Sequence, residues 1–253
     1  MKMNERGVSE AVGFILILGT VITGIGLVTL YGYPVLLKEQ SNADVKSMER
    51  AMIVIQNDMK SLCFKNVPYK ETSFHVSGGA FEVIDSSVYG GSIEVTTDTV
   101  PETYSFGALV YRSDRSNEVI TLENGAVMIR QEGTGGSAML AEPRWFYDGP
   151  TQTFVIYIMN ITVDTQMAKT GMATVRMSME DVDTKVHSDP GTVTVTYKPD
   201  TGNNLLTAWE NYLTGSSLGM DKTATSGEYG WDISSKPVNK LVIKEYKIRI
   251  HNL

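Results

Sequence analysis

The feature that most constrains this chain is a run of 27 residues, Ala11 to Leu37, without a single Asp, Glu, Lys, Arg or His. A helix rises about 1.5 Å per residue and needs about 20 apolar residues to cross the hydrocarbon core of a bilayer. The run is therefore long enough to be a transmembrane helix. Tyr31 and Tyr33 stand near its end, where aromatic rings favour the headgroup region, and Pro34 can bend the helix there.

Positive charge precedes the run, at Lys2, Arg6 and the amino terminus. The positive-inside tendency holds such a stub in the cytoplasm and places the rest of the chain outside. A cleavable secretory signal would have a shorter apolar core and an A-x-A-like site after it, and neither is present. We therefore expect a single-pass protein of the cell membrane with an extracellular C-terminal domain.

The segment that leads into the run reads Arg6-Gly7-Val8-Ser9-Glu10-Ala11-Val12-Gly13-Phe14. A basic residue and a glycine stand before the apolar residues, and this arrangement resembles the class III signal peptide of archaeal type IV pilin-like proteins. The resemblance implies that a prepilin peptidase recognises Arg6 and Gly7 and cuts between Gly7 and Val8. The apolar helix would then remain on the mature protein.

The segment departs from related families at specific positions. Bacterial pilins have a glutamate at the fifth mature position, where this chain has Val12, and archaellins usually have an early glutamine, which is missing here. The pattern favours an archaeal pilin or pilin-like surface protein, in which Glu10 enters a filament core and pairs with the new amino group of Val8. The alternative is an uncleaved anchor, in which Ser9 caps the helix and Glu10 complements its dipole.

Small residues recur along the apolar run in two helical stripes. They are Gly13, Thr20 and Gly24, and Gly19, Thr23 and Gly26. Small residues let helix backbones approach closely in lipid, so we expect assembly with other copies or other pilin-like subunits through Gly13, Thr20 and Gly24. The alternative is that glycine is simply more frequent in membrane helices than in soluble ones.

Beyond Lys38, a helical stripe of apolar residues predicts an amphipathic stalk helix over residues 38–66. Its members are Val45, Met48, Met52, Ile55, Met59 and Leu62. Ala51 to Ile55 is apolar on every side, which predicts contact with the chain's own domain on one side and with a neighbouring copy on another. The alternative is a helix covered completely by its own β domain.

From residue 69 onward, short apolar runs between turn residues predict strands. They are Ser73–Val76, Ala80–Ile84, Ser92–Thr96, Tyr104–Tyr111, Val119–Leu122, Ala126–Ile129, Thr153–Ile161, Thr174–Met179, Thr192–Tyr197 and Leu241–Ile250. Asn124-Gly125 predicts a two-residue hairpin turn, because both residues tolerate positive φ. A helix is expected at Leu205–Leu213 and a long exposed loop at Thr214–Gly230.

The expected fold class is α+β: a long N-terminal transmembrane and stalk helix, followed by one antiparallel, sandwich-like β domain. The expected organisation is a leader at 1–7, a transmembrane helix at 8–37, the stalk at 38–66 and the extracellular domain at 69–253. This architecture also suits the pilin-like resemblance, in which the helices pack in a filament core and the β domains face outward.

Residues for chemistry are few. The net charge of −7 opposes binding to a phosphate backbone, and one cysteine, Cys63, allows no internal disulfide and no multi-thiolate zinc site. The acidic cluster Glu180-Asp181-Val182-Asp183, with His187 and Asp189, lacks a calcium-loop spacing and is expected to be a solvated connection between strands. We find no catalytic motif, so we expect no enzyme activity, metal or cofactor.

Asn160-Ile161-Thr162 is an N-x-S/T sequence in the part of the chain expected outside the cell. Asn160 is therefore a candidate glycosylation site. The functional hypothesis is a membrane-anchored, type IV pilin-like surface protein that can assemble into a pilus through its N-terminal helix. The alternative is a singly anchored cell-envelope or binding protein with no filament role.

Overall fold

A computed structural model describes residues 5–65, 67–98, 101–223, 230–233 and 235–253. The backbone of residues 5–9 is described, and side chains are described from Glu10 onward. The chain divides into two compact units, one through Ala43 and one from Asp44 to Leu253. The first unit is helical, and the second contains the rest of that helix and the β domain.

The N-terminal helical segment has three parts: α1 (Glu5–Leu27), a π-helical turn, η1 (Val28–Gly32), and α2 (Tyr33–Lys65). The backbone N–H of Tyr33 donates to the carbonyl of Val28, five residues back. Pro34 has no N–H to donate and its ring crowds the preceding turn, so a wider turn at this point accommodates it. The helix therefore continues past the proline.

The β domain has two sheets and one short helix, α3 (Leu206–Thr214). The nine-stranded sheet runs in the order β7 (Ser137–Ala141), β6 (Ala126–Gln131), β5 (Glu118–Glu123), β4 (Ala108–Ser113), β1 (Tyr69–Ile84), β10 (Met167–Ser188), β14 (Lys240–Asn252), β9 (Thr153–Thr162), β8 (Phe146–Asp148). The five-stranded sheet runs in the order β12 (Asp221–Thr223), β13 (Gly230–Asp232), β11 (Thr194–Lys198), β2 (Ser92–Thr96), β3 (Pro101–Ser105). Pairing is antiparallel except between β14 and β9, which are parallel.

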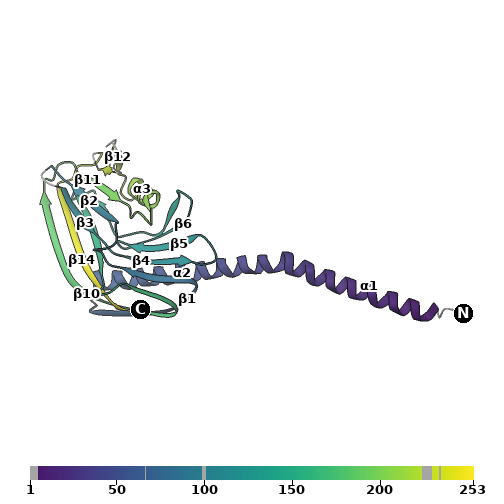
Figure 1. Ribbon diagram of the computed structural model, residues 1–253. Helices are drawn as coiled ribbons and strands as arrows, with labels where there is room; N and C mark the ends of the chain where they lie inside the picture. Colours follow the sequence, from purple (N-terminus) through teal and green to yellow (C-terminus); the bar gives the residue numbers. More distant parts are fainter. Residues whose placement is uncertain (1–4, 66, 99–100, 224–229, 234) are drawn as a thin grey trace. The chain divides into compact units, whose positions relative to one another are not determined.

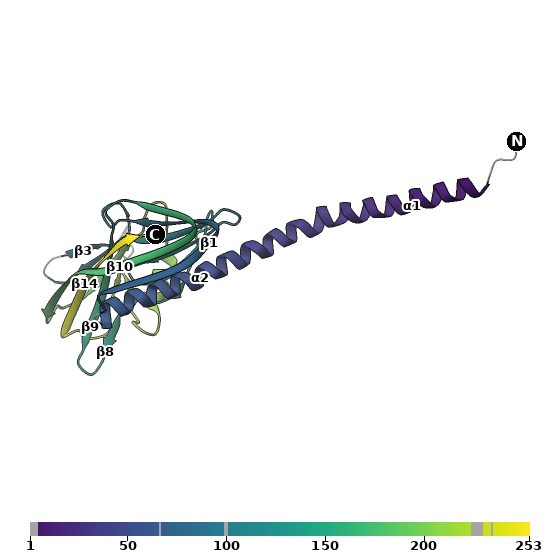
Figure 2. The same cartoon turned by 90° about the horizontal axis from the view of Figure 1, so that it is seen from below.

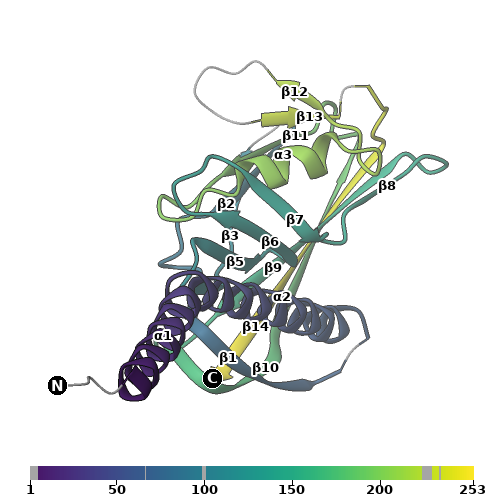
Figure 3. The same cartoon turned by 90° about the vertical axis from the view of Figure 1, so that its right-hand side faces the viewer.

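Strands β4 and β5 of the nine-stranded sheet are largely buried on both faces. Along β4, Ala108 and Val110 pack in the core shared with the five-stranded sheet and α3, whereas Leu109 and Tyr111 pack in the core shared with α2. Successive side chains of a strand point to opposite faces, which explains this division. Figure 1 shows α3 and β11 on the opposite side of β4–β6 from α2, and Figures 2 and 3 show α2 along the other face. This arrangement confirms the expected α+β fold.

The predicted stripe of α2 is confirmed, because all six residues from Val45 to Leu62 are buried against the nine-stranded sheet. The apolar pentad is covered only in part: Met52 and Ile55 are fully buried, whereas Val54 is 48% exposed. The alternative prediction, that its own β domain covers this helix completely, is therefore wrong, because the Val54 side chain is exposed.

A buried glutamine ties α2 to the hairpin between β5 and β6. Asn124 and Gly125 have φ values of 45° and 72°, as the predicted turn requires. The side chain of Gln56 donates from Nε2 to the Gly125 carbonyl at 2.7 Å and to the Glu142 carbonyl at 3.0 Å. No buried polar group is predicted for this core from the sequence. Gln56 directly follows the last residue of the apolar pentad, Ile55, and so lies beside the buried stripe.

We predict that Gln56→Ala lowers the free energy of unfolding of the β domain by about 1 to 3 kcal/mol, because the buried Gly125 carbonyl loses its donor, whereas the Glu142 carbonyl keeps its bond from Lys60 Nζ at 2.9 Å. Chemical denaturation of the detergent-solubilised chain measures this, and tryptophan fluorescence reports on the β domain because Trp145, Trp209 and Trp231 all lie there. The control Asn57→Ala, at the exposed neighbouring position, should change stability by less than about 0.5 kcal/mol. An equal effect of both substitutions contradicts the prediction.

Three local predictions are wrong. Residues 104–111 do not form one strand but parts of β3 and β4, which belong to different sheets. Gly107 lies between these two strands, where the Cβ atom of any larger residue would lie 2.5 Å from the carbonyl oxygens of Ile84 and Ile161. The acidic residues 180–183 and His187 lie in β10 rather than in a connection. In the expected loop Thr214–Gly230, Leu218 and Met220 are buried and β12 forms, while residues 224–229 lie outside the described part.

Candidate membrane and assembly helix

The helix from α1 into the first part of α2 is apolar on every side. The window that defines this span has none of its residues buried, and the large apolar side chains between Val12 and Leu37 are exposed, Phe14 to 66% and Leu30 to 71%. A helix that is apolar all round requires an apolar environment. Within the part of the chain that the structure describes, one helix is therefore long and apolar enough to cross a membrane.

The threonine hydroxyl groups on this helix are satisfied within it. Thr20, Thr23 and Thr29 each donate from Oγ1 to the carbonyl four residues earlier, at 2.8, 2.8 and 2.9 Å. Lipid tails offer no hydrogen-bond partners, so a free hydroxyl there would be costly. These threonines consequently present mainly their methyl groups to the surroundings of the helix.

A shallow hollow lies on one side of α1. It is lined by Ile15, Leu16, Gly19, Thr20, Thr23, Gly24 and Leu27. The structure thus brings Thr20 and Gly24 from one predicted stripe together with Gly19 and Thr23 from the other, and leaves out Gly13 and Gly26. We call these seven residues the small-residue hollow.

The glycines of α1 have no role in packing within the helix itself. A Cβ atom added at Gly13, Gly19, Gly24 or Gly26 would meet nothing within 4 Å. In the β domain, by contrast, a Cβ at Gly79 would lie 2.2 Å from the Arg112 carbonyl oxygen. Glycine therefore creates open space on α1 that a neighbouring helix could fill.

The residues of the predicted cleavage site lie at the start of α1. Arg6, Gly7 and Val8 are in its first turns, and residues 1–4 of the expected leader lie outside the described part. Glu10 is exposed on α1. Its expected partner is the amino group that cutting before Val8 would create, so this pairing stays a prediction.

The candidate glycosylation site lies within β9. The Asn160 side chain is half-buried and donates from Nδ2 to Glu245 Oε1 at 2.9 Å, and Thr162 Oγ1 donates to Glu180 Oε2 at 3.2 Å. Modification of Asn160 in the folded domain would have to displace the contact with Glu245. Glycosylation at this position stays a prediction.

Cys63 is half-buried near the end of α2 and packs against its core. Burial raises the pKa of its thiol to about 12, although the nearby Lys244 ammonium acts in the opposite direction. The thiolate is the nucleophilic form, so this thiol is unreactive at neutral pH. Among the described residues, no group of three or more His, Cys, Asp or Glu side chains is placed to hold a metal ion.

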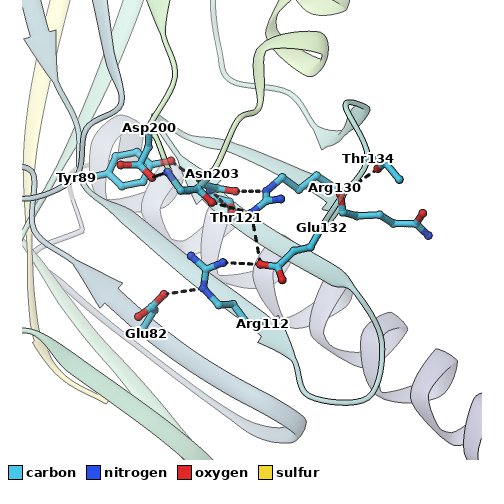
Figure 4. Close-up of polar contacts among 11 residues, drawn as sticks. Glu82, Tyr89, Arg112, Thr121, Arg130, Glu132, Thr134, Asp200 and Asn203 are labelled. Carbon is cyan, nitrogen blue, oxygen red and sulfur yellow. Dashed lines mark hydrogen bonds and ion pairs between the residues drawn. The ribbon is translucent and has the colours of Figure 1, made fainter.

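A polar cluster joins β4, β5 and β6 to the segment that precedes α3 (Figure 4). Arg130 donates from Nε to Asn203 Oδ1 at 2.6 Å, and Asn203 donates from Nδ2 to Thr121 Oγ1 at 2.7 Å. Arg112 binds Glu82 and Glu132. Both guanidinium groups are occupied by partners of the same chain, so this cluster stabilises the domain and offers no free cation for an anionic ligand.

A fully buried carboxylate lies next to this cluster. Glu123 accepts hydrogen bonds from Tyr197 OH and Trp209 Nε1, both at 2.8 Å on Oε1, and from Tyr89 OH on Oε2. Burial raises the pKa of Glu123, and the three hydrogen bonds act against that rise. This buried group was not predicted from the sequence, in which the only signal is an acidic residue directly before the Asn124-Gly125 turn.

These features define a β-domain protein with one N-terminal helix that is long and apolar enough to span a membrane. The chain belongs to a family of unknown function, DUF7289, whose model matches residues 6–239. Comparisons with curated proteins and with solved structures found no match.

Proposed function

We propose that this chain is a type IV pilin-like subunit of a surface filament, anchored in the membrane before assembly and packed helix to helix afterwards. The observation that carries the proposal is the small-residue hollow on an exposed, uncharged helix, because its glycines leave space that nothing else in the helix occupies. Helix association in lipid depends on such close packing, since apolar burial alone gives no preference for a helix over acyl chains.

The first experiment is amino-terminal sequencing of the protein extracted from membranes of cells with active prepilin peptidase. We expect the mature chain to begin at Val8. An intact amino terminus at Met1 overturns the processing step.

The second experiment is electron microscopy of material sheared from the cell surface, with antibody labelling of the β domain. A filament subunit appears along the sheared filaments. A singly anchored envelope protein stays with the membrane fraction, and that result favours the alternative function.

We predict that Glu10→Gln leaves cleavage unchanged and abolishes filaments. A carboxylate in an apolar filament core is costly unless it is paired, and the new amino group of Val8 supplies the partner only after cleavage. If Glu10 serves only the helix dipole, its contribution is about 0.3 to 1 kcal/mol, too small to decide assembly. The mature amino terminus and the filament yield are measured on the same cells.

The matched control is Glu39→Gln, which neutralises the exposed acid just beyond the other end of the apolar run. This variant should assemble normally. Normal cleavage together with normal filaments for Glu10→Gln contradicts the proposed pairing of Glu10 with the amino group of Val8.

A further inference from the structure

One half of β10 is paired on one side only. The register with β1 ends at Ser178, opposite Tyr69, whereas the register with β14 continues to Ser188, opposite Lys240. From Asp181 to Ser188 the pairing with β14 has no irregularity, and no described strand pairs with the outer side of this segment. Figure 1 shows this half of β10 as the outer strand beside β14. We call residues 181–188 the free edge.

The backbone of the free edge presents hydrogen-bonding groups that no described strand pairs with. The N–H of Val182 donates to its neighbour, Asp181 Oδ1, at 2.9 Å. Backbone groups alternate between the two sides of an antiparallel strand, so the amides of Thr184 and Val186 point to the same outer side as that of Val182. These groups form a template for another strand.

Apolar side chains on the free edge are also exposed. Val182 is 42% exposed and Val186 is 53% exposed, and they lie on one face of the sheet, beside Tyr246 and Val242 of β14. Natural edge strands usually avoid exposed apolar residues at regular spacing, because they promote pairing with other chains. This face is therefore suited to a partner strand with apolar residues at the same spacing.

The charges on the free edge are incompletely matched within the chain. Asp183 lies directly opposite Glu245 of β14, so like charges face each other. Lys185 binds Glu102 of β3 at 2.9 Å, and His187 Nε2 lies 3.8 Å from the same carboxylate. A cation opposite Asp183 on the outer side would relieve this repulsion.

We propose that the free edge binds the same edge of a second copy of this chain, in antiparallel orientation centred on Thr184. In that register Asp183 lies opposite Lys185, Asp181 opposite His187 and Val182 opposite Val186, and each pair occurs twice by symmetry. The outward-pointing amides of Val182, Thr184 and Val186 also face one another. The edge is thus complementary to itself in charge, apolarity and hydrogen bonding.

The neighbouring registers are disfavoured. Moving the centre of the pairing to residue 183 places Asp183 opposite Asp183, and moving it to residue 185 places Lys185 opposite Lys185. Like charges directly opposite each other destabilise a strand pair. Only the register centred on Thr184 pairs opposite charges at both positions while keeping the outward amides face to face.

This inference concerns the β domains and does not depend on filament formation. An edge contact of eight residues is small, but copies held in one membrane by their N-terminal helices meet at a high effective concentration. Weak pairing is sufficient under those conditions.

The test is disulfide cross-linking of the full chain in membranes, in a Gly24→Leu background so that helix-mediated filaments do not contribute. In the proposed register, the Cα atoms of the two Thr184 residues lie about 5.5 Å apart, which a disulfide spans. We expect Thr184→Cys to form a covalent homodimer on mild oxidation. Met172→Cys, at a 64% exposed position on the same strand outside the free edge, and the unsubstituted chain with Cys63 should form at least several-fold less.

Two further variants test the register and the charges. Copies carrying Val182→Cys and copies carrying Val186→Cys should cross-link when mixed but not alone, because like positions lie about 13 Å apart. Asp183→Lys and Lys185→Asp, each added to Thr184→Cys, should lower dimer yield several-fold, and the two together should restore it.

Each contrary result overturns the proposal. Equal cross-linking of Thr184→Cys and Met172→Cys shows random collision. If the double substitution that exchanges the charges does not restore the dimer, the proposed register is contradicted. Cross-linking of Thr184→Cys only to a different protein shows that another strand occupies the free edge. The processing and filament experiments are unaffected by any of these outcomes.

Discussion

Gly24→Leu should abolish filaments while leaving the protein in the membrane. Leucine is at least as compatible with lipid as glycine, so insertion is unaffected. Its side chain fills the small-residue hollow, where no side chain from elsewhere in the helix lies within 4 Å of the position of the new Cβ. Loss of about 1.4 kcal/mol per helix contact corresponds to a tenfold weaker association, and the loss would be repeated at every such contact of a subunit in the proposed filament. Sheared-filament yield and membrane-bound protein are measured from the same cells.

The matched control is Gly26→Leu, which makes the same substitution two residues away and outside the hollow. It should leave filament yield within about twofold of the unsubstituted chain, a difference worth less than 1 kcal/mol. Unchanged filaments in Gly24→Leu show that the hollow faces lipid. Equal loss in both variants shows a general intolerance of the helix rather than a specific packing face.

Glu123→Ala should destabilise the β domain by about 4 kcal/mol, the largest effect that we expect of a single substitution in this domain. Three buried donors, on Tyr89, Tyr197 and Trp209, lose their acceptor, at about 1 to 3 kcal/mol each before relaxation. Denaturation followed by tryptophan fluorescence measures the loss. Glu71→Ala, at a solvent-exposed position on β1, is the control and should change stability by less than about 0.5 kcal/mol.

The same residue gives the domain a pH dependence. Burial raises the pKa of Glu123 in the folded state, whereas in the unfolded chain a glutamate titrates at about 4.3. The folded state therefore binds this proton more tightly. The contribution to stability is complete below the unfolded pKa and is lost as pH rises through the folded pKa.

Glu123→Gln cannot titrate, so the fall in stability that Glu123 causes as the pH rises above its unfolded pKa of about 4.3 should be absent in this variant. Denaturation curves across that range, compared with those of the unsubstituted chain, measure the difference. Identical pH dependence of the two proteins contradicts the assignment. A Glu123→Ala variant as stable as the unsubstituted chain contradicts the structural role itself.

Local patterns in the sequence determined much of this protein. The uncharged run from Ala11 to Leu37 favours an apolar environment. Apolar residues at alternating spacings of three and four positions identify the buried face of α2. The Asn124-Gly125 turn and the strand at Leu241–Ile250 were also predicted correctly, because each depends on neighbouring residues alone.

Only the tertiary structure decided how those elements combine. The split of residues 104–111 between two sheets, the parallel pairing of β9 with β14 and the extension of β10 to Ser188 depend on strands far away in the sequence. From the sequence, the acidic residues after Met179 were predicted to form a solvated connection between strands. In the structure their backbone pairs with β14 on one side, and β1 is too short to pair with them on the other side. The burial of Gln56 and Glu123 depends likewise on partners more than 30 residues distant, which no local pattern records.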